Sequence, residues 1–489
     1  MLARHTRRAV GIRPLKALGR RHYGSTPPLA ATCSTPASSA VLAPLMNELD
    51  RMAPSFDVSG DKIKILGTPA EFYATLKDRI RNAKRRIFLS TLYIGRSEAE
   101  LIAVLGDALR NTPALTVSIL TDALRGTREA PGPSCASLLA PLVAEFGPSR
   151  VEIRMYHTPN LTGLRRACVP RRINEGWGLQ HMKLYGIDDE IILSGIHKAV
   201  GSCSFLVEPL AEEAGFGLVW PGSNAAPSPL DDAERFIQGT THALQSLIAP
   251  PHPRQPLRHG SCADTRIYML AQMSQILRPD SSSELPVVTR ILEFLGSPAL
   301  RGSSWTFTAG YFNPAPSLSK LLVSTVSEGN TVITAAPEAN GFYKSRGISG
   351  LLPDAYVLLA RRFLRGVEQA GRASHVVLKE WRRGTAGQPG GWTYHAKGLW
   401  VTLPGDAHPA LSVVGSSNYT KRSYSLDLEA GALIVTQNED LKRRLADEQR
   451  WLQEYAQPVT MDDFARTERR VGLKVRLAMW MVQLLGGAL

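Results

Sequence analysis

The sequence has few cysteines and no long apolar segment, and these two absences exclude several classes of protein. Its 489 residues include five cysteines, an odd number, and no two of them form a C-x-x-C pair. That spacing argues against a disulfide framework and against a zinc site built from thiolates. Because no stretch of about 18 uninterrupted apolar residues is present, no conventional membrane-spanning helix is expected.

Acidic residues are absent from the first 47 positions, which contain seven Lys and Arg residues. The whole chain has 57 Lys and Arg against 43 Asp and Glu, a net charge of +14, so removal of this segment would halve the positive excess. A basic, hydroxyl-rich, acid-free segment without a long apolar core is typical of mitochondrial transit peptides. We therefore interpret 1–47 as a transit peptide and linker, although a disordered arm that binds polyanions would have the same composition.

A second basic segment, 466–489, leads into an apolar stretch that is too short to span a bilayer. Such a tail could lie in the interface of an anionic membrane, with its basic residues near the lipid headgroups. Packing of a terminal helix onto the protein core would explain the same apolar residues, and the sequence leaves both interpretations open.

Strands and helices alternate in both halves of the chain. In the first half the apolar pattern predicts helices at 69–84 and 97–111, and strands at 86–95, 116–121, 151–156 and 191–195. In the second half it predicts strands at 305–311, 331–335, 375–379 and 411–415, and helices at 316–326 and 350–371. This alternation predicts an α/β fold. A Pro-rich segment separates the halves, which gives a first lobe at 48–248, a linker at 249–260 and a second lobe at 261–465.

Each half contains a His-x-Lys pair on a predicted strand, His181 with Lys183 and His395 with Lys397. Residues i and i+2 of a strand point to the same face, so each pair projects together. A neutral imidazole is a nucleophile near neutral pH, and an ammonium group can hold phosphate oxygens. If the pairs converge, one imidazole can attack phosphorus while the other protonates the leaving group. Asp188 follows the first pair across a turn and could orient an imidazole.

Longer motifs around these pairs resemble a known family. His181-x-Lys183-x₄-Asp188, and His395-x-Lys397 followed by GSSN at 415–418, resemble the two signatures of the phospholipase D superfamily. Six further strings narrow the resemblance: LYIG at 92–95, LRGTR at 124–128, GLQHMKLY at 178–185, YFNP at 311–314, AAPEANGFY at 335–343 and WTYHAKGLW at 392–400. Together they resemble the family of mitochondrial CDP-diacylglycerol–glycerol-3-phosphate 3-phosphatidyltransferases.

The resemblance implies a fold, a reaction and residue roles. The fold would be two duplicated lobes, each a mixed β-sheet flanked by helices, with the active site between them. The reaction would transfer the phosphatidyl group of CDP-diacylglycerol to glycerol 3-phosphate through a phosphohistidine, without a metal or other cofactor. His181 would attack phosphorus and His395 would act as acid and base, while Lys183 and Lys397 would hold the phosphoryl oxygens.

The resemblance also implies a set of substrate-binding candidates: Arg125, Arg128, Ser416, Asn418 and Glu429. The two arginines fit a substrate phosphate or a surface salt bridge equally well. The second motif lacks the acid that Asp188 provides in the first, and Asp427 or Glu429 could replace it as the carboxylate that orients a histidine.

One part of the first motif departs from the family pattern, because His197 stands where an Asn is expected two positions after Gly195. A catalytically impaired membrane scaffold therefore remains an alternative, as does a hydrolase of the superfamily, either a phospholipase or a nuclease. Our main interpretation is a phosphatidyltransferase on an anionic mitochondrial membrane, on the matrix face of the inner membrane, with no nucleic acid partner.

Overall fold

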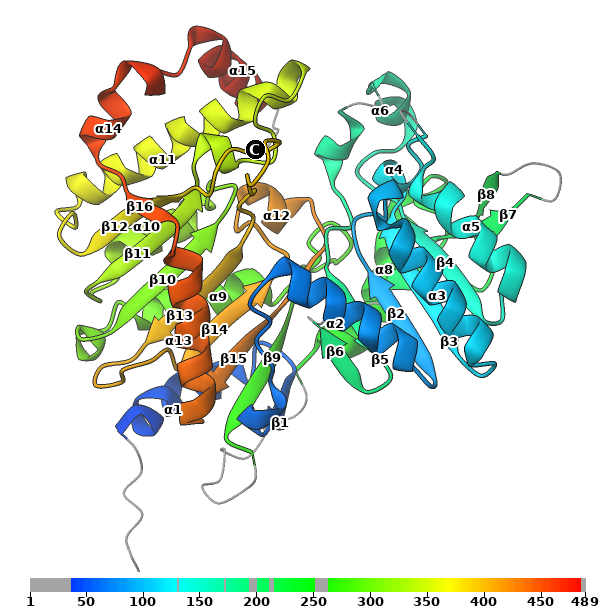
Figure 1. Ribbon diagram of the computed structural model, residues 1–489, viewed down its shortest axis with the longest axis horizontal. Coiled ribbons are helices and arrows are strands. Elements are labelled where there is room, and N and C mark those ends of the chain that lie inside the picture. The colour runs from blue at the N-terminus through cyan, green and yellow to red at the C-terminus, as the bar shows by residue number, and fades with distance from the viewer. Residues whose placement is uncertain are drawn as a thin grey trace, which may run out of the picture. The chain divides into compact units, whose positions relative to one another are not determined.

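Two β-sheets, one in each half of the chain, form the framework of the computed structural model (Figure 1). The structure describes residues 37–129, 132–170, 173–192, 200–210, 215–250 and 263–484. Three features of the sequence lie outside the described residues: the basic start of the chain, most of the Pro-rich linker, and the motif break at Gly195 and His197.

The first sheet contains seven strands in the order β6 (Glu190–Ile192), β5 (Leu184–Ile187), β2 (Arg86–Ser90), β3 (Thr116–Asp122), β4 (Val151–Tyr156), β7 (Phe205–Pro209) and β8 (Phe216–Val219). Strands β2, β3 and β4 are parallel, and β5 is antiparallel to β2. The apolar runs that predicted these strands belong to the centre of the sheet, where both faces are covered.

Helices cover this sheet with their apolar sides. The three longest that pack on the first-lobe core are α2 (Pro69–Asn82), α3 (Ala99–Asn111) and α5 (Cys135–Phe146). Helix α2 begins where the sequence predicts it, because the Thr68 side chain accepts a hydrogen bond from the backbone N–H of Glu71 and Pro69 fits the first turn. Shorter or later helices are α4 (Ala123–Gly126), α6 (Gly163–Cys168) and α8 (Ala233–Ile248).

The second sheet contains nine strands in the order β1 (Ser55–Val58), β9 (Thr265–Gln272), β15 (Glu429–Thr436), β14 (Leu411–Gly415), β13 (Lys397–Thr402), β10 (Ser304–Ala309), β11 (Asn330–Ala335), β12 (Val376–Trp381) and β16 (Ala456–Pro458). Its order β14-β13-β10-β11-β12 repeats the order β6-β5-β2-β3-β4 of the first sheet, with the same parallel and antiparallel pairings. The predicted α/β fold with two duplicated lobes is confirmed.

Helices also flank the second sheet. They are α9 (Glu284–Phe294), α10 (Pro316–Ser324), α11 (Leu352–Gln369), α12 (Lys421–Ser425), α13 (Glu439–Gln453), α14 (Met461–Ala465) and α15 (Leu473–Leu484). Short 3₁₀ turns are η1 (Gly60–Lys62), η2 (Arg96–Glu98), η3 (Asn174–Trp177), η4 (Pro298–Leu300), η5 (Pro337–Ala339), η6 (Gly347–Leu351) and η7 (Thr467–Arg469). No described helix combines the length and the apolar character needed to cross a bilayer.

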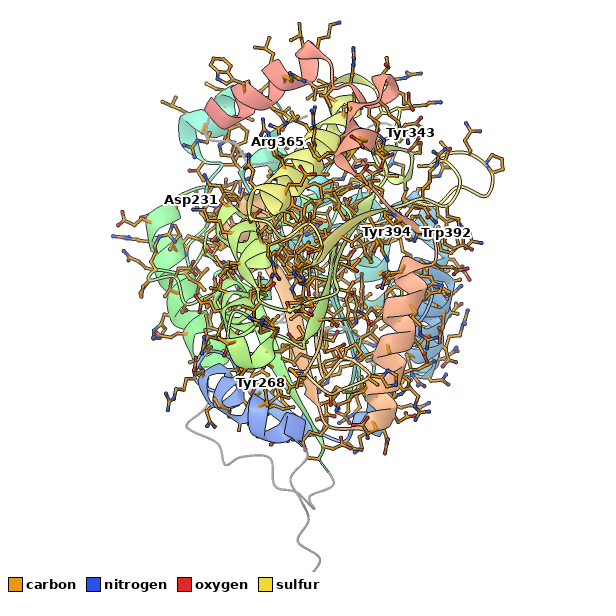
Figure 2. All side chains as sticks on the ribbon, turned by 90° about the vertical axis from the view of Figure 1, so that its left-hand side faces the viewer. Asp231, Tyr268, Tyr343, Arg365, Trp392 and Tyr394 are labelled. Atoms are coloured by element: carbon orange, nitrogen blue, oxygen red, sulfur yellow. The ribbon has the colours of Figure 1, made fainter. Side chains whose placement is uncertain are left out.

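The residues before the first lobe pack on the second lobe, so the expected boundary at residue 48 does not coincide with one in the structure. Helix α1 (Ala37–Leu49) buries Leu42, Leu45 and Leu49 in the core of the second lobe, and β1 pairs with β9. Tyr268 of β9 lies beside α1 (Figure 2) and donates a hydrogen bond to the carbonyl of Met46. The spacing of these leucines gives α1 one apolar face, which the second sheet and α9 cover.

The two lobes share a core of their own. Leu120, Tyr156 and Met182 of the first lobe belong to one buried cluster with Met273 and Leu428 of the second. Phe236 and Leu244 of α8 complete this cluster. The described residues from 37 to 484 accordingly form one compact unit, which fixes the two His-x-Lys pairs relative to each other.

Candidate active site

Backbone pairing between the lobes positions the first histidine. Residues 179–181 run alongside 427–429, with a parallel bridge between Gln180 and Leu428. The backbone N–H of His181 donates to the carbonyl of Leu428 at 2.9 Å. On the other side, the buried carboxylate of Asp122 accepts a hydrogen bond from the backbone N–H of Gln180 at 2.9 Å. The segment before β5 is therefore held from both lobes.

A carboxylate of the second lobe contacts this histidine directly. The Nδ1 atom of His181 lies 2.9 and 3.0 Å from the two carboxylate oxygens of Glu429, at the start of β15. The Glu429 side chain is fully buried and that of His181 is 13% exposed. Since a carboxylate accepts hydrogen bonds, the Nδ1 atom carries the proton and the Nε2 atom keeps its lone pair.

Burial shapes the protonation of both partners. It lowers the pKa of His181 well below its ordinary value, and the positive charge of Lys183 lowers it further. Burial also raises the pKa of Glu429, against the opposing effects of Lys183 and Ser416. The imidazole is therefore neutral near pH 7, which is the form that acts as a nucleophile.

The two lysines and His395 complete the cluster. The Nζ atom of Lys397 lies 3.0 Å from the Nε2 atom of His395, and that of Lys183 donates to the carbonyl of His181 at 2.6 Å. Burial lowers the pKa of both lysines, and the positive charge of Lys183 adds to the effect on Lys397. The positive charge of Lys183 disfavours a second charge on Lys397, so an anion such as phosphate bound between the two lysines would favour the charged form of both.

His395 has a different environment from His181. The ring of Tyr311 packs against it, with 4.6 Å between ring centroids. Burial lowers the pKa of His395, and the charges of Lys397, His181 and Lys183 lower it further. Within the described parts of the chain no carboxylate contacts His395, whereas His181 contacts Glu429.

The structure does not bring Asp188 to either histidine, so the expectation that it orients an imidazole is wrong for this structure. Its carboxylate accepts hydrogen bonds from the backbone N–H groups of Lys84, Arg85 and Arg86, at 2.9, 2.8 and 3.0 Å. Asp188 follows β5, whereas His181 precedes it, and the strand separates them. A positive φ of 52° turns the chain here into β6. Asp188 thus fixes the start of β2 to the β5–β6 turn.

Arg125 and Arg128 both reach the same acid. Their guanidinium groups lie 3.3 and 2.5 Å from one carboxylate oxygen of Glu175 in η3. The guanidinium of Arg125 also stacks over the ring of Tyr93, at 4.9 Å. Of the two predicted roles, the structure shows the salt bridge, and each arginine keeps about a third of its side chain exposed.

Ser416 and Asn418 follow β14 near the histidines. The Ser416 hydroxyl donates to the Glu429 carboxylate at 2.5 Å, so it orients the partner of His181 instead of pointing to open space. The Oδ1 atom of Asn418 is buried and has no hydrogen-bond partner among the described residues. Asn418 is therefore the member of this pair with an unused polar group.

Sequence reasoning missed Asp122, Glu175 and Tyr311 as site residues. Asp122 ends β3 two positions before the LRGTR string begins, and Tyr311 opens the YFNP string, so both lie at motifs that the sequence singled out. Glu175 lies close before the GLQHMKLY string. Nothing in the spacing indicated the partners of these side chains, because the contacts join separate chain segments: Asp122 with Gln180, Glu175 with the two arginines, and Tyr311 with His395.

A cavity of about 1830 Å³ extends from His395 between the sheets. Its lining is mostly apolar and includes Phe72 of α2, Met269 of β9 and Ile434 of β15. The described residues contain no group of three or more His, Cys, Asp or Glu side chains that could hold a metal ion.

Comparison with known proteins gives close relatives over most of the chain. The CDP-diacylglycerol–glycerol-3-phosphate 3-phosphatidyltransferase of Saccharomyces cerevisiae is 39% identical, covering 86% of this chain and 88% of the yeast protein. The human protein named as the mitochondrial form is 32% identical, covering 88% of this chain and 84% of its own length. The chain matches no protein-family model.

Among solved structures, the crystal structure of a phosphatidylserine synthase from Haemophilus influenzae Rd KW20 has a similar fold. Its TM-score is 0.63 at 17% identity, covering 90% of this chain and 96% of that chain. This similarity supports the two-lobed architecture.

Proposed function

The chain belongs to the family of CDP-diacylglycerol–glycerol-3-phosphate 3-phosphatidyltransferases, and from this premise we propose how it performs the reaction. It transfers the phosphatidyl group of CDP-diacylglycerol to glycerol 3-phosphate and releases CMP. The observation that carries the proposal is the buried hydrogen bond between His181 and Glu429 beside two lysines. It combines a neutral nucleophile with cations for a phosphate.

In the first step the Nε2 atom of His181 attacks the phosphorus that bears diacylglycerol. The bond between this phosphorus and the CMP oxygen breaks, and His395 gives a proton to the departing CMP. Burial and the neighbouring cations lower the pKa of His395 in the free enzyme. The two negative charges of the substrate's pyrophosphate act in the opposite direction, so substrate binding favours its protonated form.

In the second step the hydroxyl of glycerol 3-phosphate attacks the phosphohistidine. His395 takes the hydroxyl proton, the bond between phosphorus and the His181 nitrogen breaks, and phosphatidylglycerophosphate leaves. Lys183 and Lys397 hold the phosphoryl oxygens in both steps. Asn418 donates to them through its Nδ2 amide group, because its Oδ1 atom, which has no partner among the described residues, can only accept. Arg125 and Arg128, already paired with Glu175, form a basic rim for the acceptor phosphate.

The names of the relatives and the exposed side chains of the C-terminal helix support a proposal for where the protein is located in the cell. The mammalian relatives are named as mitochondrial, and we assign this chain to the mitochondrion. We further propose that it acts peripherally on the anionic matrix face of the inner membrane. The lipid substrate and the exposed apolar side chains of α15 support a membrane partner over nucleic acid.

Release of CMP from CDP-diacylglycerol, measured with and without glycerol 3-phosphate, tests the reaction. Release that requires the acceptor supports the transferase, release without it indicates a hydrolase, and no release indicates an inactive scaffold.

His181→Ala should abolish release because no covalent intermediate can form. His395→Ala should reduce the rate by about 10²–10⁴-fold through loss of acid and base catalysis. A near-normal rate in the His181 variant would refute the assignment.

A further inference from the structure

A second cluster of positive charge lies away from the histidines, where the C-terminal helix packs on α11. A pocket of about 590 Å³ separates the two helices at this point. Its lining is formed by Leu358, Arg361, Arg362, Arg365, Arg476, Met479 and Trp480. The volume is within the range of pockets that bind small ligands.

The helical spacing explains why four arginines meet here. Arg365 lies four positions after Arg361 and three after Arg362 on α11, so its side chain shares a helix face with each of them. Arg365 lies on α11 next to the C-terminal helix (Figure 2), and Arg476 of α15 faces the same pocket. Four guanidinium groups therefore line the same pocket.

These charges are not neutralised within the described part of the protein. No ion pair joins Arg361, Arg362, Arg365 or Arg476 to a described acid, and the acids of α11 do not line the pocket. The Nε atom of Arg361 is buried without a hydrogen-bond partner. Two other basic residues of the tail differ, because Arg466 pairs with Asp463 and Arg469 pairs with the buried Glu380. The four arginines lack the anion that their geometry would bind.

Helix α15 also presents an apolar ridge beside this pocket. Val475 and Met479 are buried against α11, and they fix the helix to the core. Leu473, Leu477 and Trp480 lie toward the exposed side of α15, with 83%, 57% and 57% of their surface exposed, and Trp480 also lines the edge of the pocket. The spacing of these three places them on one side of the helix. An exposed apolar ridge with Trp next to arginines is the composition of an interfacial membrane helix.

We propose that the pocket between α11 and α15 binds the phosphate of an anionic phospholipid headgroup in the bilayer. Arg362, Arg365 and Arg476 contact the phosphate oxygens, and the ridge of Leu477 and Trp480 enters the headgroup–acyl boundary. This inference rests on the proposed association with an anionic membrane and adds a specific headgroup site to it. A free phosphate has the same oxygens but would make no use of the apolar ridge.

Vesicle sedimentation of the full chain tests the site. The probes are vesicles of phosphatidylcholine and vesicles of phosphatidylcholine mixed with phosphatidylglycerol. The test variant is Arg362→Gln/Arg365→Gln/Arg476→Gln. The control variant, Arg81→Gln/Lys84→Gln/Arg301→Gln, removes the same charge from exposed positions elsewhere. We expect the wild-type chain and the control to bind the anionic vesicles. The test variant should bind at least about tenfold more weakly, since each basic residue near an anionic surface adds roughly fivefold.

Three results would overturn the inference, and they are distinguishable. Equal loss in both variants would mean that net charge alone drives binding. Weaker binding of inorganic phosphate to the test variant than to the wild-type chain, with vesicle binding unchanged, would identify a free-phosphate site. Absence of wild-type binding to either vesicle would contradict the proposed membrane association itself. Circular dichroism, together with CMP release from substrate in neutral detergent micelles, confirms that the test variant is folded, because its arginines lie outside the catalytic cluster.

Discussion

At the scale of single residues, Glu429 is the side chain through which one lobe controls the chemistry of the other. Its carboxylate holds the Nδ1 atom of His181 and stabilises positive charge on the ring when the ring bonds to phosphorus. We expect Glu429→Gln to lower kcat by about 10²-fold or more while KM changes little. The amide keeps the shape of the side chain and removes its negative charge. The rate of CMP release at saturating substrate measures the change in kcat.

A matched control for this prediction is Glu448→Gln. Glu448 is also a carboxyl of the second lobe whose pKa burial raises, to about 7, but its partner is the Trp400 indole at 3.1 Å and not a histidine. Near-wild-type kcat in the Glu448 variant, together with intact folding of both, would locate the effect at His181. Equal losses of kcat in the two variants would contradict a positioning role for Glu429.

The two site lysines predict a pH dependence. Burial holds the pKa of Lys183 and of Lys397 below the ordinary 10.5 in the free enzyme, and the positive charge of Lys183 lowers the pKa of Lys397 further. As the pH rises through these lowered values, the ammonium groups lose their charge and their hold on the substrate phosphates. A pH profile of kcat/KM should therefore fall on the alkaline side well below pH 10.5. In the Lys397→Arg variant the positive charge persists, so the alkaline fall in kcat/KM should occur at a higher pH. If the fall stays at the same pH, Lys397 does not cause it.

At the scale of elements, α1 is an integral part of the second lobe. Leu45 is completely buried there, so Leu45→Ala should lower the free energy of unfolding by about 2–5 kcal/mol, from lost burial and the cavity left behind. Denaturant titration measures this change. Leu164→Ala in α6 is the control, since Leu164 is 85% exposed, and it should change stability little. Equal effects of the two substitutions would contradict the packing of α1.

Helices and strands could be predicted from the sequence where the apolar pattern within one segment determines them. The buried strands and amphipathic helices of both lobes lie close to their expected ranges, because apolar periodicity is set within each segment. The predicted strand at 86–95 ends early, at Ser90, since the chain then turns at the carboxyl end of β2. The docking of α1 on the second lobe was not predictable, because an apolar face does not specify which sheet will cover it.

In the active site as well, local sequence pattern predicted some residues, whereas others depend on contacts between distant segments. The two His-x-Lys pairs were identified from repetition and spacing. Glu429 was one of two acids proposed to replace the acid that the second motif lacks, whereas in the structure it contacts the histidine of the first motif. The partner of each acid could not be read from the sequence. Asp188 lies near Lys183 in the chain yet bonds to the start of β2, whereas Glu429 lies 248 residues from His181 and contacts it. The backbone pairing of 179–181 with 427–429 is what brings Glu429, and not Asp188, to His181.

At the scale of the whole molecule, the duplication is unequal. In the second lobe β15 follows β14 and carries Glu429, but no described strand pairs with the outer side of β6 in the first lobe. The motif break after Gly195 falls at the corresponding place in the sequence, outside the described residues. This difference accounts for a histidine with a carboxylate partner, His181, and one without, His395, in the described structure.

The contact between the lobes also predicts that one chain builds one complete site. His181 and Glu429 meet within the same chain, and the shared core of Met182 and Leu428 holds both pairs together. Co-expression of the His181→Ala and His395→Ala variants should therefore give no more CMP release than the two variants measured separately, because neither chain can lend its intact histidine to the other. Co-expression of each variant with the wild-type chain is the control for expression level. Clear recovery in the mixed sample would mean that sites form between two copies, with the lobes exchanged.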